Sequence, residues 1–266
     1  MKPRVLVLTG YGINCDYETE YAFSMRRVGG TAERVHVNDI IDSRAKGTKL
    51  SKYHILAVPG GFSYGDDIGA GKALANKLQN HLRQHLEQFI RDGKLIIGIC
   101  NGFQVLVKMG LLPAIAGKYG EQHVTLMYND SNKFEDRWVY LAVNPKSHCI
   151  FTKGIDTMYL PVRHGEGKLV AADFGVLAQL HEGGHVALQY VNKEGKLDGY
   201  PSNPNGSQDN IAGLCDPTGR IFGLMPHPEA YLFPTNHPRW TREKVPREGM
   251  GVAVFRNAVK YVKENL

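Results

Sequence analysis

The segment Lys94–Gln104 constrains the fold most, because it joins an apolar run to a helix through a very tight turn. Leu95–Ile99 is short and apolar, which is typical of a strand buried on both faces of a parallel sheet. Gly98 and Gly102 flank Cys100, and residues without a Cβ let the strand and the following helix approach closely. The pattern predicts a nucleophile elbow whose nucleophile is a cysteine.

The thiol of Cys100 has two interpretations at this point. It precedes a helix expected from Phe103 to Met109, and the positive end of a helix dipole favours a reactive thiolate. Free cysteine is also among the residue types most often buried without reacting. The elbow leaves both interpretations open, and a reactive thiol needs a base from elsewhere in the chain.

Strands and helices alternate through the first 110 residues. The expected helices cover residues 17–28, with Asp16 as a candidate N-cap, and 70–92. Residues 39–52 are polar and are expected to form a loop or a short helix. The remaining apolar runs predict strands over residues 4–10, 32–37, 53–58 and 95–99. This alternation predicts an α/β fold with a flavodoxin-like open parallel sheet and helices on both faces.

The pattern changes after Gly110 to short strands separated by turns, without long helices. Such runs of strands predict an antiparallel β extension, about residues 120–200, packed on the first half. We expect a last strand over 220–225, a proline-rich loop over 231–249 and an amphipathic helix over 251–264, all within a single domain of residues 1–266. The strands expected in the extension cover residues 124–128, 137–143, 158–163, 176–180 and 185–191.

Composition and charge exclude several classes of protein. No apolar run approaches the ~20 residues that span a bilayer, and the first apolar stretch is too short for a signal-peptide core of ~7–15 residues. We therefore expect a cytoplasmic protein without a membrane partner. The net charge is +6, but the basic residues are dispersed and no aromatic-interleaved motif accompanies them, so no nucleic-acid partner is expected.

The cysteines and histidines give no signal of a metal site. The four cysteines are far apart and form no C-x-x-C pair, which argues against a disulfide framework and a zinc ribbon. His81 and His85 have the i, i+4 spacing of a helical ligand pair but lack a clear third ligand. No metal is expected in this chain.

His227 and Glu229 are the best candidates to assist the thiol. His227 lies between two prolines at the end of the last expected strand, and Glu229 follows two residues later. Residues i and i+2 of an extended segment point the same way, so the carboxylate can hold one ring nitrogen while the other serves Cys100. A capped loop histidine and an ordinary surface acid are the alternatives.

Two glycines at another strand end supply a candidate oxyanion hole. Gly60 and Gly61 follow the strand expected over 53–58, where backbone N–H groups can point at a ligand. The carboxyl ends of parallel strands meet at one edge of a sheet, so this turn and Cys100 can be neighbours. A simple tight turn is the alternative, and residues 163–168 and 200–207 can likewise be a hairpin and a loop.

Taken together, these segments resemble the class I, or triad-type, glutamine amidotransferases, and among them the glutaminases of phosphoribosylformylglycinamidine synthases. The Cys and His-Pro-Glu elements are shared widely in that family, whereas the other motifs narrow the resemblance to the purine enzyme. Ala230 departs from the arginine that is frequent there, and the loop 231–249 resembles the family only loosely. The motifs are GICNGFQ (98–104), PGGFSYGD (59–66), HGEG (164–167), NPNGS (203–207) with IAG (211–213), and GLMPHPE (223–229).

The resemblance implies roles for individual residues. Cys100 would attack the amide of glutamine and form a γ-glutamyl thioester. His227 would protonate the departing ammonia and then activate water, while Glu229 orients His227. Gly60 and the backbone N–H groups of Gly61 or Phe62 and of Asn101 would bind the oxyanion. Gln104, Gly165 and Glu166 would lie near the bound glutamine.

The resemblance also implies partners. The chain would receive glutamine and pass ammonia to a larger synthetase subunit, and a small third subunit stays an open question. ATP and magnesium are expected on the synthetase, with no cofactor in this chain, which lacks a Gly-x-x-x-x-Gly-Lys-Ser/Thr loop. The alternatives are another triad amidotransferase or a γ-glutamyl hydrolase, and a non-catalytic binding or redox-sensing protein with Cys100 as its oxidisable thiol.

Overall fold

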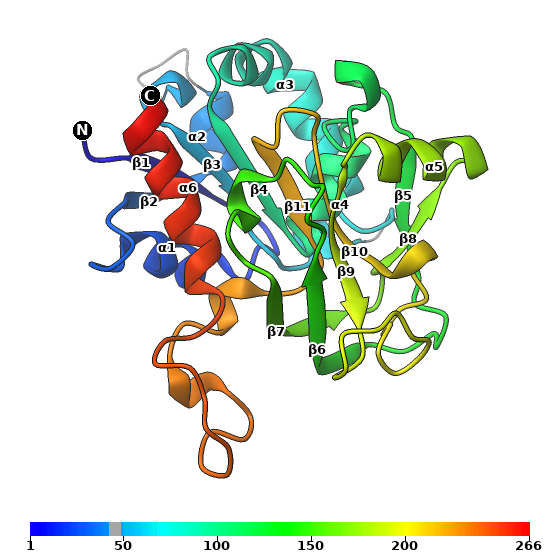
Figure 1. Cartoon of the computed structure of the whole chain (residues 1–266). Coiled ribbons are helices and arrows are strands. Elements are labelled where there is room, and N and C mark those ends of the chain that lie inside the picture. Colours follow the sequence, from blue (N-terminus) through cyan, green and yellow to red (C-terminus); the bar gives the residue numbers. More distant parts are fainter. Residues whose placement is uncertain (43–48, 67) are drawn as a thin grey trace.

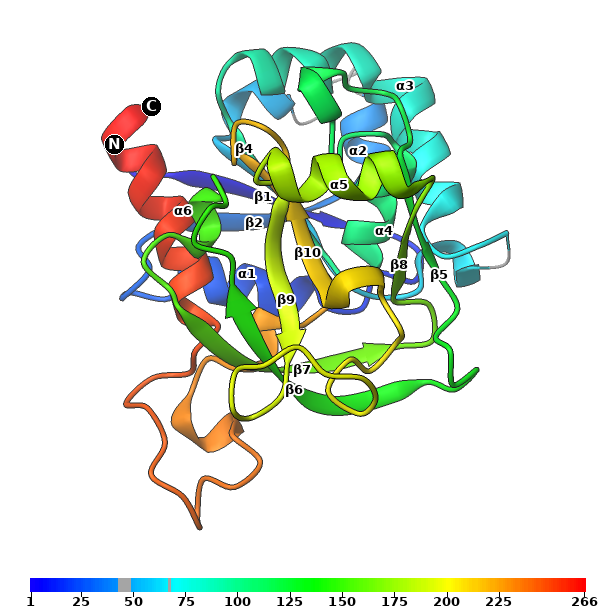
Figure 2. The same cartoon turned by 45° about the vertical axis from the view of Figure 1, so that its right-hand side comes forward.

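One mixed sheet runs through the whole molecule (Figures 1 and 2). The computed structural model describes residues 1–42, 49–66 and 68–266. Five strands of the sheet are parallel neighbours in the order β2-β1-β3-β4-β11. This is the strand order of a flavodoxin-like doubly wound fold, as predicted. The strands are β1 (Arg4–Thr9), β2 (Thr31–His36), β3 (Ile55–Val58), β4 (Leu95–Ile99) and β11 (Ile221–Leu224).

The antiparallel extension continues this sheet instead of packing on it. Four strands follow β11 in the order β10-β9-β6-β7, each antiparallel to its neighbour. The antiparallel extension expected over about residues 120–200 is present, and it joins the parallel strands because the second edge of β11 needs a hydrogen-bonding partner, which β10 provides. The strands are β6 (Glu135–Val143), β7 (Thr157–His164), β9 (Val186–Val191) and β10 (Ile211–Cys215), with a separate pair of β5 (Val124–Met127) and β8 (Lys168–Ala171).

Helices cover both faces of the parallel half (Figure 2). α1 (Asp16–Ser24) and α6 (Val252–Asn265) lie on one face, where the rings of Phe23 and Phe255 meet edge to face at 4.9 Å. α3 (Lys72–Arg91) and α4 (Asn101–Lys108) lie on the other face, with the short α2 (Val37–Ile41). The buried leucines of α3 lie on the side of the helix that faces the sheet, because residues four apart share one side of a helix. They are Leu74, Leu78, Leu82 and Leu86.

The segment expected as a strand over 176–180 is instead part of a helix, α5 (Phe174–Glu182). Asp173 caps this helix, and its Oδ1 accepts a hydrogen bond of 2.8 Å from the N–H of Val176. Val176 and Leu180 are buried four residues apart, a spacing that suits a helix face. Two strands, β8 and β10, were missed.

The ends of the first helices also differ from expectation. Cys15, not Asp16, is the N-cap of α1, and the helix ends four residues early at Ser24. The carboxylate of Asp16 pairs instead with Arg34 at 3.2 Å, so it is not available to cap. Of the segment 39–52, α2 and a 3₁₀ turn at Leu50–Lys52 are seen, and residues 43–48 lie outside the described residues.

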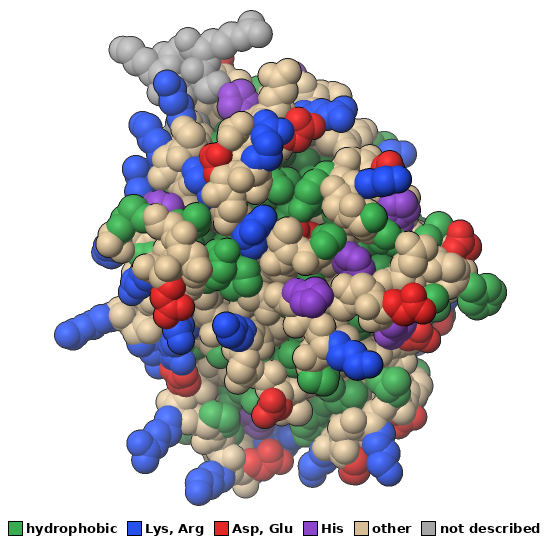
Figure 3. Space-filling model, turned by 45° about the horizontal axis from the view of Figure 1, so that its top comes forward, with side chains coloured by type: hydrophobic (Ala, Val, Ile, Leu, Met, Phe, Trp, Pro, Cys, Tyr) green, Lys and Arg blue, Asp and Glu red, His purple; other side chains and the backbone are tan. Residues whose placement is uncertain are grey.

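The loop predicted over 231–249 leaves the body of the molecule as an irregular arm before α6 (Figure 1). On the face drawn in Figure 3, lysine and arginine side chains are interspersed with aspartate and glutamate. Within the described residues, no helix combines the length and the apolar character that crossing a membrane requires.

Candidate active site

The turn between β4 and α4 holds Cys100 in a strained backbone conformation. Its φ is 50° and its ψ is −107°, in a region that costs a residue with a Cβ about 1–3 kcal/mol. The N–H of Cys100 donates to the carbonyl of Leu224 on the neighbouring β11 at 2.8 Å. A Cβ on Gly102 would lie 1.8 Å from the carbonyl oxygen of Val58. The predicted elbow is therefore present, and only glycine fits at 102.

His227 and Glu229 follow β11 and lie buried beside this turn. The N–H of His227 donates to the carbonyl of Pro161 on β7 at 2.8 Å, and Nδ1 lies 2.6 Å from Glu229 Oε1. Burial acts to lower the pKa of His227, but the Glu229 carboxylate and the Cys100 thiol together raise that pKa well above its usual value. The ring nitrogen Nε2, which a general base would use, has no hydrogen-bond partner among the described residues.

Gly60 lies where the carboxyl ends of β3, β4 and β11 meet. A Cβ at this position would lie 2.8 Å from Cε1 of His227 and 3.4 Å from Cβ of Cys100. It would also lie 3.4 Å from Sγ of Cys15. A side chain at residue 60 would push the imidazole away from the elbow, so the glycine allows the histidine and the catalytic candidate Cys100 to approach each other.

Cys15 was not among the residues that the sequence analysis selected. Its Sγ lies 3.9 Å from Nδ1 of His227, and burial raises the pKa of its thiol. Cys15 follows β1, which is parallel to β3, so it reaches the same edge of the sheet as Gly60. The rule that parallel strands end at one edge could have identified it.

The backbone N–H groups of Gly61 and Phe62, the two oxyanion donors proposed on the turn after β3, differ in whether they are already hydrogen-bonded. The N–H of Phe62 is already used, because it donates to the carbonyl of Gly12 at 2.7 Å. The N–H of Gly61 donates to no group in the described ranges. Asn101 is the first residue of α4, so its N–H has no acceptor within the helix. Gly61 and Asn101 thus keep free donors, whereas Phe62 does not.

The side chain of Asn101 joins the glycine turn to α4. Its Oδ1 accepts from the N–H of Ser63 at 3.2 Å, and its Nδ2 donates to Asp66 Oδ1 at 3.2 Å and to Gln104 Oε1 at 2.9 Å. Gln104 then donates from Nε2 to the carbonyl of Glu166 at 2.5 Å. These bonds fix the turn relative to the elbow, which an oxyanion hole requires.

The end of β7 and the residues that follow it border the site. Sγ of Cys100 lies 3.6 Å from the carbonyl oxygen of Arg163, and Oε2 of Glu166 accepts from the N–H of Ala70 at 3.3 Å. A Cβ on Gly165 would meet nothing within 4 Å. Gly165 therefore faces open space, where a substrate can approach its backbone.

A buried polar network holds this segment in place. Asn129 Oδ1 lies 3.1 Å from Nδ1 of His164 and accepts from the N–H of Gly167 at 3.0 Å, and Asn205 Nδ2 donates to the carbonyl of Gly167 at 2.9 Å. Burial, with the nearby charge of His227, lowers the pKa of His164 to about 3. These hydrogen bonds hold the segments 163–168 and 203–207 against each other. Asn129 is therefore a positioning residue, and the sequence analysis did not identify it.

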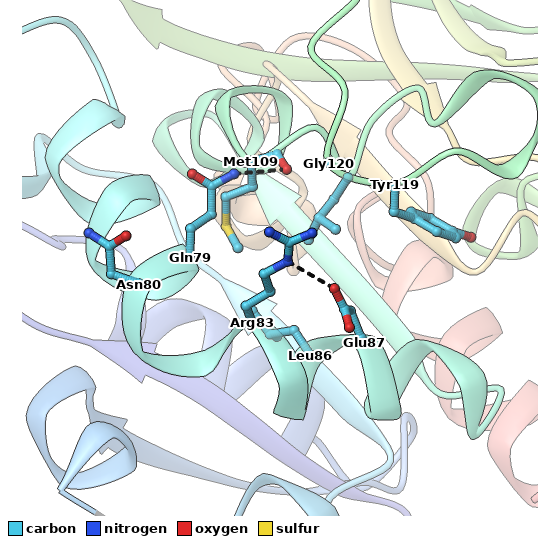
Figure 4. Close-up of a pocket in the computed structure, with 9 residues that line it drawn as sticks. Gln79, Asn80, Arg83, Leu86, Glu87, Met109, Tyr119 and Gly120 are labelled. Atoms are coloured by element: carbon cyan, nitrogen blue, oxygen red, sulfur yellow. Dashed lines mark hydrogen bonds and ion pairs between the residues drawn. The ribbon is translucent and has the colours of Figure 1, made fainter.

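Two hollows lie near α3 and near Glu229. The first, of about 260 Å³, contains the ion pair of Arg83 with Glu87 at 3.0 Å (Figure 4), and none of the predicted site residues lines it. The second is a groove of about 550 Å³ that reaches Glu229. We call it the Glu229 groove; it is lined by Tyr17, Glu18, Tyr21, Arg163, Glu229, Ala230, Leu232, Phe233 and Asn236.

Known proteins match this chain over nearly its whole length. The family model described as a CobB/CobQ-like glutamine amidotransferase domain matches residues 2–262. A protein of Dehalococcoides mccartyi named phosphoribosylformylglycinamidine synthase subunit PurQ is 48% identical, covering 99% of both chains. A Methanococcus maripaludis protein of the same name is 44% identical, covering 97% of both.

Solved structures agree with these sequence matches. A chain of a structure described as PurLQS from Thermotoga maritima superposes with a TM-score of 0.71 and 31% identity, covering 98% of this chain and 100% of that one. A glutamine amidotransferase from Thermotoga maritima shares the fold, with a TM-score of 0.54 and 14% identity over 100% of both chains. The chain belongs to the CobB/CobQ-like glutamine amidotransferase family, on the branch of the phosphoribosylformylglycinamidine synthase PurQ subunits.

Proposed function

We infer that this chain is the glutaminase subunit of a phosphoribosylformylglycinamidine synthase. It hydrolyses glutamine to glutamate and ammonia, and a synthetase subunit uses the ammonia to convert formylglycinamide ribonucleotide to formylglycinamidine ribonucleotide with ATP. The observation that carries this conclusion is the meeting of Cys100, His227 and Glu229 around Gly60 in a chain that matches PurQ subunits end to end.

The first half-reaction releases ammonia. Sγ of Cys100 attacks the amide carbon of glutamine, and its proton passes to Nε2 of His227. The oxyanion that forms is bound by the N–H groups of Gly61 and Asn101, a contribution for which one lost donor costs ~10²–10³ in rate. The C–N bond then breaks, His227 returns the proton to the leaving ammonia, and a γ-glutamyl thioester remains on Cys100.

The second half-reaction restores the thiol. A water molecule gives a proton to Nε2 of His227 and attacks the thioester carbon. The C–S bond then breaks, Nε2 passes the proton to Sγ of Cys100, and glutamate is released. Glu229 accepts from Nδ1–H of His227 throughout, which fixes the ring and stabilises its positive charge. The 2.6 Å separation of Nδ1 and Glu229 Oε1 supports this role.

The ammonia has to be consumed by a partner. A free glutaminase would waste glutamine, so we propose that the chain works in a complex with a larger synthetase subunit, which binds ATP and magnesium. No cofactor is proposed for this chain. The Thermotoga maritima relative that is 31% identical belongs to a structure described as PurLQS, and the three letters of that name support a third subunit in the complex.

Reconstitution with the synthetase tests the proposal. The complete complex should form formylglycinamidine ribonucleotide from glutamine in an ATP-dependent reaction, and the isolated chain should be a weak glutaminase because catalytic geometry often tightens only in the complex. A Cys100→Ser complex should lose the glutamine-dependent reaction and keep the reaction with added ammonium. Glutamine hydrolysis of equal rate with and without the synthetase would contradict the proposal and favour a γ-glutamyl hydrolase.

A further inference from the structure

Cys15, His227 and Glu229 form a cluster with the donor atoms of a metal site. Sγ of Cys15 lies 3.9 Å from Nδ1 of His227, which lies 2.6 Å from Oε1 of Glu229. One donor atom from each residue lies within 4.8 Å of the other two, and no other such group occurs in the ranges that the structure describes. The reaction proposed above uses His227 and Glu229 but gives no role to Cys15.

A second observation comes from the other carboxylate oxygen. Oε2 of Glu229 is buried and has no hydrogen-bond partner among residues 1–42, 49–66 and 68–266, and only 1% of the Glu229 side chain is exposed. A buried polar atom without a partner costs free energy. The oxygen is therefore free to serve as a ligand.

The cluster can also be reached from outside. Glu229 is one of the residues that line the Glu229 groove, and Cys15 is partly exposed. Glu18 in the lining of the groove attracts a cation, whereas Arg163 in the same lining repels it. The partly exposed Cys15 therefore gives an ion an entry path to the cluster, which a metal site requires.

We propose that Cys15, His227 and Glu229 bind Zn²⁺ as an inhibitory ion. Thiolate, imidazole and carboxylate are the ligands that zinc takes in proteins, at about 2.3, 2.0 and 2.1 Å. Sulfur and nitrogen ligands at those distances lie about 3.6 Å apart in a tetrahedron, close to the 3.9 Å between Cys15 Sγ and His227 Nδ1. Water supplies the fourth ligand.

Binding would change the state of the histidine. The Cys15 thiol loses its proton to solvent as the Zn–S bond forms, and Nδ1 of His227 exchanges its hydrogen bond to Glu229 for the metal. The single proton of the neutral ring then lies on Nε2, which can no longer accept a proton from Cys100. The inhibition rests on the proposed function, whereas metal binding does not.

Cobalt is a probe for binding, because a thiolate ligand gives Co²⁺ a charge-transfer band in the near ultraviolet. The Cys100→Ser protein should show this band, and Zn²⁺ should abolish it by displacing cobalt. The Cys15→Ser protein should lack the band. A band that is lost in Cys100→Ser but kept in Cys15→Ser would place the ion on the catalytic thiol and overturn the proposal, as would a band in both variants or in neither.

Alkylation provides a readout in the unmodified chain, which avoids any folding defect of a variant. Iodoacetamide modification of Cys15, mapped by mass spectrometry, should slow at least about tenfold when Zn²⁺ saturates the site, because a thiolate bound to the metal is no longer a free nucleophile. Cys149, which is buried elsewhere, is the internal control. Unchanged alkylation of Cys15 would overturn the proposal.

Inhibition is measured on the synthetase complex with glutamine. Zn²⁺ should inhibit and a chelator should restore the rate, and Cys15→Ser should raise the half-inhibiting zinc concentration at least about tenfold, each protein being compared with its own zinc-free rate. An unchanged zinc response in Cys15→Ser would refute the inhibitory role. If the chain proves not to be a glutaminase, the cobalt band still decides the metal site by itself.

Discussion

Two neighbouring histidines of equal burial have opposite acid–base behaviour. His164 at the end of β7 and His227 after β11 are each 2% exposed. His227 faces the Glu229 carboxylate, and its pKa is raised. His164 faces the amide groups of Asn129 and Asn205, and its pKa falls to about 3. The comparison shows that a carboxylate, and not burial, decides which histidine can carry a proton at neutral pH.

The largest effect is expected from removing the imidazole of His227. In the synthetase complex, His227→Asn should lower the glutamine-dependent kcat by ~10⁴–10⁶, because members of such a triad act as a unit. His164→Asn should affect kcat far less and lower the free energy of unfolding by ~1–3 kcal/mol. Steady-state kinetics and urea unfolding separate the two variants, and equal losses of kcat would break the comparison.

Glu229→Gln tests the carboxylate itself. The amide keeps the shape of the side chain but neither stabilises the charged ring nor holds the same tautomer, so kcat should fall by ~10²–10⁴. The reaction with ammonium should persist, since it bypasses the triad. A kcat within about threefold of the unmodified complex would show that Glu229 does not act on His227.

Gly60→Ala should separate the histidine from the elbow. The new Cβ would lie 2.8 Å from Cε1 of His227, and a displacement of about 1 Å can cost ~10² in rate. Gly199→Ala is the matched control, because a Cβ there meets nothing within 4 Å. Similar glutamine-dependent rates for the two variants would indicate that the site tolerates the side chain.

The smallest effects are expected in the pH dependence of stability, with opposite signs for the two histidines. The folded pKa of His164 lies below its unfolded value, so the unfolded state takes up the extra proton and stability is lost as pH falls below about 6.5. The folded pKa of His227 is raised, so its stabilising contribution is complete below about 6.5 and is lost as pH rises through the folded pKa.

Urea unfolding between pH 5 and 8 checks these signs. His164→Asn should reduce the loss of stability on acidification, and His227→Asn should reduce the loss as pH rises. Each variant is compared with the unmodified chain over the same range, so that other titrating groups cancel. A variant that changed the slope in the opposite direction would contradict the assigned protonation states.

Much of the site could be predicted because each of its motifs lies within a few consecutive residues. Gly98, Cys100 and Gly102 specify the elbow within a few residues, and His227 and Glu229 are close enough in sequence to meet. Cys15 and Asn129 carry no such local signal, since their partners are far away in the chain. The helix over 174–182 was missed because its short apolar spacing also suits a strand.

The sequence by itself determined the flavodoxin-like parallel half and the motifs of Cys100, Gly60 and His227 that meet at its edge. Periodicity and turn chemistry act between near neighbours, so they can be read without coordinates. Only the tertiary structure decided that the extension joins the sheet through β10, that Phe62 has no free N–H, and that Sγ of Cys15 lies 3.9 Å from Nδ1 of His227. These features depend on contacts between distant segments, which the packing of the whole sheet fixes.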